Sequence, residues 1–349
     1  MTTRTAERPG VTRLRPLAVA GGLATLLLCA AGAVLLGAVD LGWQRVLGEV
    51  LAQLTGSTSP LNEREAAIVW QLRAPRVALA AVVGAALAGA GAAFQGVFRN
   101  PLADPYLLGA ASGAGLAATL VMVLAPAGPG WVLGTVQLAA FAGALGGVGL
   151  SWLLSRSVGG AGTATLLLAG IAVAAFLSAV QAFVQQLDTD SLQQVYTWML
   201  GGLATGGWRE LSAALPSVIA AAGVLLACAR LLDVLALGDT EARALGIRPG
   251  VLRLALLGAA SLATAAAVSV SGLVGFVGIV VPHIVRLLFG WSYRVVVPMS
   301  LITGAVFVIL ADQIARSALP GELPLGVVTA FAGAPFFALV LYRNREAAT

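Results

Sequence analysis

Long stretches without a charged residue constrain this chain more than any other feature. Eight of them reach membrane-spanning length, at residues 16–39, 77–98, 105–155, 157–187, 211–229, 254–285, 295–311 and 323–342. A helix needs about 20 apolar residues to cross a bilayer, and it satisfies its own backbone polar groups there. Only 10% of the 349 residues are charged, against about 25% in soluble domains. The sequence therefore predicts an all-α, polytopic membrane protein.

The number of membrane spans follows from the lengths of these stretches. Residues 105–155 are long enough for two spans, with a turn at residues 125–130, and residues 254–285 hold two more, broken near residues 269–272. The total is about ten spans, so both termini lie on one side. That side receives fourteen of the twenty arginines, and the other side receives Arg45, Arg64, Arg73, Arg76, Arg209 and Arg316. The excess of arginines predicts that both termini are cytoplasmic.

The chain divides into one membrane domain and two short tails. We assign residues 1–15 to a basic cytoplasmic tail, residues 16–342 to a single transmembrane domain and residues 343–349 to a second cytoplasmic tail. Residues 41–54 have apolar positions at helical spacing but are too short to cross, which predicts an interfacial helix on the outer face. The net charge of +5 reflects this topology and does not indicate nucleic-acid binding.

A short polar segment at residues 230–253 interrupts the apolar stretches and must lie in water. We expect Gly238 to end the preceding helix, Asp239 or Thr240 to cap a new one, and Gly246 to stop it in a left-handed conformation. Isolated helices shorter than about 12 residues are marginal in water, so this one needs support from the bundle or from a partner. It is either a docking element for a cytoplasmic protein or an ordinary solvated loop.

The second span is rich in small residues. Gly84, Ala88, Gly91 and Ala92 lie on related faces of the predicted helix, and such faces let helix backbones approach closely in membranes. We therefore expect this span to lie at the centre of the bundle. The prolines at positions 101 and 105 end it on the cytoplasmic side, because proline cannot continue a helix.

Several motifs occur in one order over residues 73–337. They are RAPR, a small-residue span ending in FQG, FRNPLADPYLLG, LGDTEARALGI, GFVGIVVPHIVRLLFG and ADQIARSALPGELPLGVVTAFAGAPFF. Together they resemble the permease subunits of the FecCD family, which belong to ATP-binding-cassette importers of iron siderophores, haem and cobalamin. The resemblance implies a bacterial cytoplasmic (inner) membrane protein that pairs with a second permease subunit, as a homodimer or a paralogous heterodimer.

The resemblance also implies two further kinds of partner and a substrate class. Two cytoplasmic ATPase subunits and an extracytoplasmic substrate-binding protein are expected. A ferric siderophore is the first expectation for the substrate, with haem or cobalamin as alternatives, and no cofactor is expected. The binding protein selects the ligand in this family, so the permease sequence does not identify it.

Site residues are carried over by the same resemblance. Residues 232–250 match the coupling loop that lodges in a groove of the ATPase, with Gly238, Asp239, Thr240, Glu241, Arg243 and Gly246 at its centre. Arg73, Arg76 and Arg316 match outer arginines that meet carboxylates of the binding protein, although Arg316 is also spaced to pair with Asp312 one turn earlier.

Two more sets complete the predicted site residues. Thr163 and Thr165, at the start of the fifth span, match the cytoplasmic gate, although Ala164 stands where a serine is usual in some members. Asn100, Pro101, Asp104 and Pro105 form a structural turn after the second span.

The sequence excludes or disfavours other function classes. A P-loop needs a lysine to reach the terminal phosphates of ATP, and this chain contains no lysine, so ATP hydrolysis must belong to a separate subunit and the chain itself is not expected to be an enzyme. An ion-coupled secondary transporter is the remaining alternative. Such proteins use charged groups at mid-membrane depth, and the predicted spans are nearly devoid of them.

Overall fold

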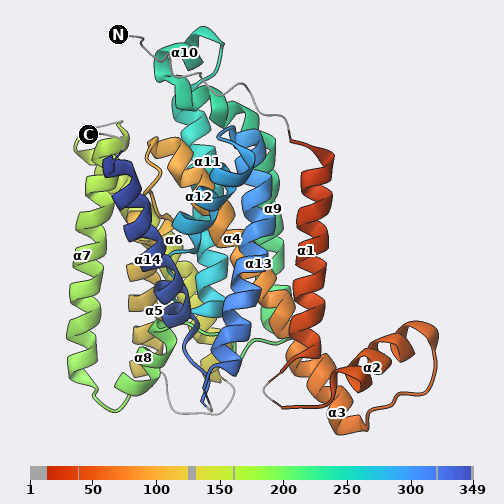
Figure 1. The fold of residues 1–349 in the computed structure, drawn as a ribbon. Coiled ribbons are helices and arrows are strands. Elements are labelled where there is room, and N and C mark those ends of the chain that lie inside the picture. Colours follow the sequence, from red (N-terminus) through yellow and green to blue (C-terminus); the bar gives the residue numbers. More distant parts are fainter. Residues whose placement is uncertain (1–13, 38, 125–130, 160–161, 320, 347–349) are drawn as a thin grey trace.

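The computed structural model describes residues 14–37, 39–124, 131–159, 162–319 and 321–346, which form a helical bundle (Figure 1). The first half contains α1 (Pro16–Leu35), α2 (Trp43–Thr55), α3 (Glu63–Ala67), the π-helix η1 (Ile68–Arg73), α4 (Ala74–Phe98), the 3-10 helix η2 (Pro105–Leu108), α5 (Ala110–Leu124), α6 (Trp131–Ser157) and α7 (Thr163–Leu187). The second half contains α8 (Leu192–Met199), α9 (Trp208–Leu237), α10 (Asp239–Ala244), α11 (Pro249–Ser271), α12 (Val277–Phe289), α13 (Tyr293–Ser317) and α14 (Leu325–Glu346).

Helices of membrane-spanning character make up most of the bundle, and no described residue lies in a strand. Seven described helices are long and apolar enough to cross a membrane: α1, the continuous helix of residues 63–98, α6, α7, α9, α11 and α13. The apolar helices α5, α12 and α14 are shorter. These elements coincide with the predicted spans, and the predicted break in residues 254–285 is confirmed, because α11 ends at Ser271 and α12 begins at Val277. The turn expected at residues 125–130 lies outside the described residues.

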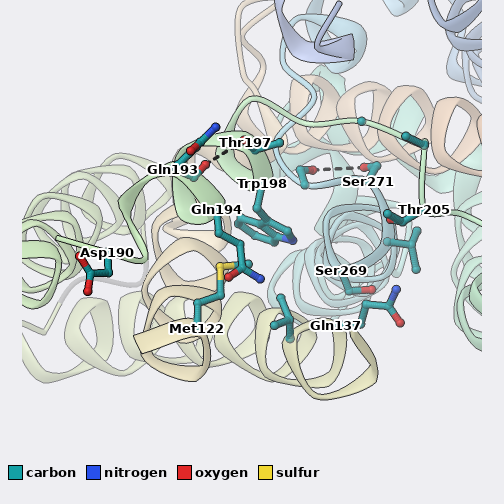
Figure 2. A pocket seen from close by; sticks show the side chains of 15 residues that line it. Met122, Gln137, Asp190, Gln193, Gln194, Thr197, Trp198, Thr205, Ser269 and Ser271 are labelled. Carbon is teal, nitrogen blue, oxygen red and sulfur yellow. Dashed lines mark hydrogen bonds between the residues drawn. The ribbon is translucent and has the colours of Figure 1, made fainter. Parts of the chain in front are cut away.

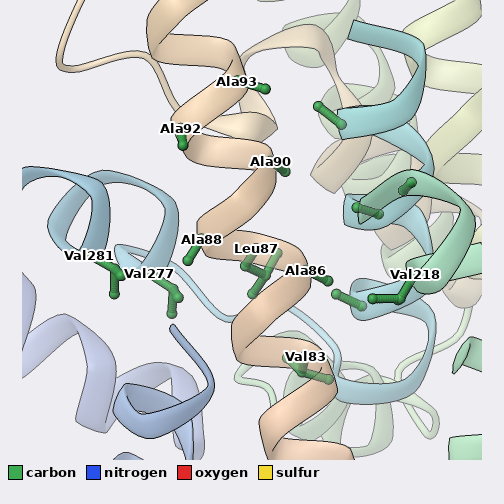
Figure 3. Packing of buried hydrophobic residues seen from close by; sticks show 14 of the residues in the cluster. Val83, Ala86, Leu87, Ala88, Ala90, Ala92, Ala93, Val218, Val277 and Val281 are labelled. Atoms are coloured by element: carbon green, nitrogen blue, oxygen red, sulfur yellow. The ribbon is translucent and has the colours of Figure 1, made fainter. Parts of the chain in front are cut away.

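Helix α4 lies at the centre of the bundle, as its small residues predict. Most of its residues are buried, and Figure 3 shows its alanines and Leu87 facing Val218 of α9 and Val277 and Val281 of α12. The neighbouring backbones are very close. A Cβ atom added at Gly84 would lie 2.1 Å from the carbonyl oxygen of Gly304 on α13. Glycine is therefore required where α4 crosses α13.

The two ends of the bundle carry different structures. One end, here called the α10 end, carries α10, the start of α1 and the end of α14 (Figure 1). The opposite end, here called the α8 end, carries α2, α3 and α8. Main-chain hydrogen bonds connect the linkers at the α8 end: Gly202 N–H donates to Ser271 O at 2.8 Å, and Leu325 N–H donates to Gly201 O at 2.9 Å. The linker after α8 therefore binds both the end of α11 and the start of α14.

Helix α2 confirms the short amphipathic helix predicted at residues 41–54. Its buried face includes Glu49, which accepts a hydrogen bond from the Trp70 indole at 2.9 Å. The opposite face exposes four large apolar side chains, Trp43, Leu47, Leu51 and Leu54. A position in the membrane interface suits such a face and stays a prediction.

Candidate transport and docking sites

The polar segment at the α10 end folds into a short helix bounded by two glycines. Helix α9 ends at Leu237, and Gly238, with a φ of 149°, joins it to α10. The prediction that Asp239 or Thr240 caps α10 is wrong, because the helix begins at Asp239 and Gly238 occupies the N-cap position. No side-chain hydrogen bond caps this end of the helix. Gly246 has a φ of 76°, and its N–H donates to Arg243 O at 2.9 Å. The predicted left-handed stop is therefore confirmed.

The carboxylate of Asp239 does not cap α10 because it binds two arginines from other helices. Its Oδ1 lies 2.7 Å from Nη2 of Arg99 and 2.5 Å from Nη2 of Arg253. Arg99, at the end of α4, also donates from Nη2 to Leu235 O of α9 at 2.8 Å. Burial raises the pKa of Asp239, but the guanidinium groups of Arg253 and Arg99 outweigh it and leave this pKa below its usual value. This Asp239 cluster (Arg99, Asp239 and Arg253) ties α10 to α4, α9 and α11.

The other face of α10 is open to solvent. Ala242 is buried against the bundle, whereas Thr240, Glu241 and Arg243 are exposed. Leu245, directly after the helix, is 65% exposed. The helix thus presents charged side chains and one large apolar side chain on a base fixed by the Asp239 cluster. This arrangement suits contact with another protein.

At the α8 end, Arg76 binds two carboxylates. Its guanidinium contacts Asp312 of α13 at 2.8 Å and Glu322, in the linker to α14, at 2.9 Å. Both contacts are bidentate. The Asp312 side chain is 1% exposed, whereas that of Glu322 is 43% exposed. We call Arg76, Asp312, Arg316 and Glu322 the Arg76 cluster; Glu322 is its accessible carboxylate.

The other two predicted docking arginines are buried. Arg316 is 6% exposed, and its Nε lies 3.1 Å from Oδ2 of Asp312, which confirms the pairing one turn apart. Arg73 is 5% exposed and donates to Val34 O at 3.1 Å and Leu35 O at 3.3 Å. It thereby satisfies carbonyl groups that the end of α1 leaves without a helical partner. Docking of a partner on these arginines stays a prediction.

The predicted structural turn follows α4. Asn100 Oδ1 accepts from Leu102 N–H at 2.9 Å, and Asp104 Oδ1 accepts from Tyr106 N–H at 2.7 Å. Pro105 begins η2, and the Tyr106 hydroxyl donates to Val274 O at 3.1 Å. Burial raises the pKa of Asp104 to about 6, although its hydrogen bond from Tyr106 acts in the opposite direction. The turn, which also includes Pro101, therefore packs against the linker between α11 and α12.

The predicted gate residues lie in the first turn of α7. Helix α7 begins at Thr163, and both Thr163 and Thr165 are partly buried. This turn is at the α10 end (Figure 1). The exposed Ala164 lies between them. Their role in gating stays a prediction.

A cavity of about 560 Å³ lies at the α8 end. Side chains of Met122, Gln194 and Trp198 face it together (Figure 2). The other lining residues shown there with labels are Gln137, Asp190, Gln193, Thr197, Thr205, Ser269 and Ser271. This vestibule cavity is lined mainly by amides, hydroxyls and apolar groups, and none of its described lining residues is cationic. The described residues contain no group of three or more His, Cys, Asp or Glu side chains that could hold a metal ion.

Sequence reasoning missed the partners that organise both charged clusters. Glu322 meets Arg76 across 246 positions, and Arg99 meets Asp239 across 140. No local pattern encodes contacts this distant. The one available signal was the position of Arg99 at the end of a span, next to the predicted turn.

The described features define a multi-pass helical membrane protein whose two ends carry separate charged sites. The chain belongs to the FecCD transport family, whose model matches residues 24–343. It is 44% identical to the cobalamin import system permease protein BtuC of Halobacterium salinarum, over 80% of this chain and 74% of that protein. It is 39% identical to the Fe(3+) dicitrate transport system permease protein FecC of Escherichia coli, over 84% of this chain and 87% of that protein.

A solved structure has the same fold. It is reported as an inward-facing conformation of a metal-chelate type ABC transporter, with a TM-score of 0.81 and 28% sequence identity, and the match covers 94% of this chain and all of that one. Family members of this kind are permease subunits and are not themselves enzymes.

Proposed function

We propose that this chain is the transmembrane permease subunit of a binding-protein-dependent, ATP-driven importer of metal chelates. The observation that carries the proposal is α10, whose exposed face is held on the bundle by the Asp239 cluster. A motor protein that pushes on a loosely attached loop would move only the loop. Because Arg99 and Arg253 connect α10 to α4 and α11, movement of α10 passes to the membrane helices. Two copies, or one copy and a paralogue, would bind two ATPase subunits.

Replacement of Gly246 tests this role of α10. Valine strongly disfavours the positive φ of Gly246, so Gly246→Val should misplace the end of α10 and abolish transport-stimulated ATP hydrolysis in the reconstituted complex. Gly250→Val is the matched control, because Gly250 also has open space around it but no positive φ. Normal transport by the Gly246 variant would refute the coupling role.

We further propose ten spans with both termini in the cytoplasm of a bacterium, and the α8 end outside. The common location of the start of α1 and the end of α14 supports an even number of crossings. A cysteine at Glu241 should then react only with reagent added from the cytoplasm, and a cysteine at Ser191 only from outside. Labelling of position 241 from outside would contradict this topology.

Arg76, together with the neighbouring Arg73 and Arg316, is proposed to receive a carboxylate of the binding protein. Glu322 is the exposed partner of Arg76, so an incoming carboxylate would compete with it. We expect Glu322→Gln to strengthen docking at low ionic strength, because it removes the exposed carboxylate that competes for Arg76, and Arg76→Glu to weaken docking, because it replaces an attractive charge with a repulsive one. Unchanged affinity of the binding protein for both variants would refute this assignment.

For the substrate, we propose a ferric siderophore. We also propose that Thr163 and Thr165 form the gate at the cytoplasmic side of its pathway. Cobalamin is the second candidate, favoured by the 44% identity to a cobalamin permease and by the amides and hydroxyls of the vestibule cavity, which suit an uncharged, hydrogen-bonding chelate. Uptake of iron-loaded siderophore and of cobalamin by the reconstituted importer, with the binding protein encoded beside this chain, distinguishes the two.

A further inference from the structure

A second cavity, of about 460 Å³, opens between α6 and α9 at the α8 end. Its floor is the end of α11, where Ala266, Ser269 and Val270 line it. In the most apolar stretch of each helix, 28% of the α6 residues and 33% of the α9 residues are buried, whereas 67% of the α11 residues are buried. Helices α6 and α9 therefore lie at the surface of the bundle and α11 lies behind them. The groove that they form therefore opens on the outside of the bundle.

The groove changes from polar to apolar along its length. Both α6 and α9 begin at the α8 end, so Gly134, Gln137 and Arg209 lie near the rim. Leu138, Phe141, Ala213, Ala214 and Ala266 line the deeper part, where Ser217 is the polar exception. From Arg209 to Ser217 the helix rises about 12 Å. An occupant with a polar head and an apolar tail matches this order.

Arg209 gives the rim a positive charge that has no partner among the described side chains. Its guanidinium lies across α6: a Cβ atom added at Gly134 would be 3.1 Å from Nη2. Within the described residues this guanidinium forms no ion pair or hydrogen bond. The adjacent carboxylate of Glu210 instead accepts from Gly207 N–H at 2.8 Å. Arg45, Arg76 and Arg316, at the same end, all have carboxylate partners.

We infer that this groove binds an anionic phospholipid from the membrane leaflet at the α8 end. The headgroup phosphate and its negative charge lie against Arg209, and an acyl chain runs past Phe141 and Ala213 over Ala266. Basic pockets between membrane helices bind anionic headgroups on the cytoplasmic side of membranes, and a guanidinium attracts a phosphate in the same way in the opposite leaflet. Apolar groove walls favour burial of the chain.

The groove also adjoins the vestibule cavity. Gln137, Ser269 and Val270 line both. A lipid in the groove therefore contacts the wall that separates it from the vestibule cavity. It braces α6, α9 and α11 against one another where α11 ends.

Native mass spectrometry of the assembled importer, loaded with either phosphatidylglycerol or phosphatidylcholine, tests the site. The wild type should retain phosphatidylglycerol in preference. Arg209→Gln should lower its retention about fivefold, the effect of one cation at a membrane surface, and should remove the preference. Ala213→Phe fills the groove and should lower retention of both lipids. Arg64→Gln, which removes an exposed arginine on α3 at the same end, is the control and should match the wild type.

Two results would overturn the inference. One is equal phosphatidylglycerol retention by the wild type and by both groove variants. The other is a disulfide between two copies carrying Leu138→Cys, because it would show that a second copy of the chain covers the groove. The ATPase activity of each variant complex, measured in parallel, shows whether it has assembled.

Discussion

Neutralising Asp239 should release α10 from the bundle without unfolding the bundle itself. Asp239→Asn keeps the size of the side chain and one acceptor oxygen but removes the charge that binds Arg99 and Arg253. The Asp239 side chain is 30% exposed, Arg253 17% and Arg99 39%. Exposed ion pairs contribute about 0.2–1 kcal/mol, and hydrogen bonds to charged groups about 1.5–3 kcal/mol. For this partly exposed cluster we expect a loss of about 1–2 kcal/mol.

Hydrogen exchange of the α10 amides measures this loss directly. Ala242 N–H donates to Gly238 O at 3.0 Å, and Leu245 N–H donates to Glu241 O at 3.2 Å. If opening of α10 becomes easier by about 1–2 kcal/mol, their exchange should accelerate about 5- to 30-fold. Amides in the centre of α4 should not change, because their protection depends on the buried bundle.

Glu241→Gln is the matched control for this experiment. It removes a negative charge from the same helix, and Glu241 forms no ion pair within the described residues. We expect its exchange rates to match those of the wild type. Equal exchange in the Asp239 variant and the wild type would show that the cluster does not hold α10, and the proposed path of movement into α4 and α11 would fail with it.

Two further predictions concern the bundle and the turn after α4. Gly91→Ala should destabilise the detergent-solubilised protein by about 1–3 kcal/mol, because the added Cβ would lie 2.0 Å from Gly278 O. Gly223→Ala is the control and should not destabilise it, because nothing lies within 4 Å of a Cβ added there. Equal melting temperatures of the two variants would refute the close approach. Asp104, whose pKa rises from 3.8 to about 6 on folding, binds more protons in the folded state, so this contribution to stability is present at low pH and is lost as the pH rises through about 6. Asp104→Asn should remove that part of the pH dependence of the melting temperature, and an unchanged profile would contradict it.

Local sequence determined the helices and their ends. Charge-free length predicted where the apolar helices lie, because lipid excludes unpaired polar groups whatever the tertiary arrangement. The end of α4 before Pro101 and the stop at Gly246 follow from the backbone preferences of single residues. The spacing of Gly84 and Gly91 identified a central helix, since only small residues permit such close backbone contact.

The tertiary structure alone decided which charges meet. The sequence suggested that Asp239 caps its own helix, but Arg99 at the end of α4 and Arg253 of α11 both bind its carboxylate. Two guanidinium groups compensate the negative charge more fully than one backbone N–H of the helix would. Glu322 and Arg76 meet because α13 packs against α4, so that the linker between α13 and α14 lies over the start of α4. The lipid groove likewise depends on three helices from separate parts of the chain. Contacts of this kind depend on packing across the bundle, and periodicity and spacing within one segment carry no information about that packing.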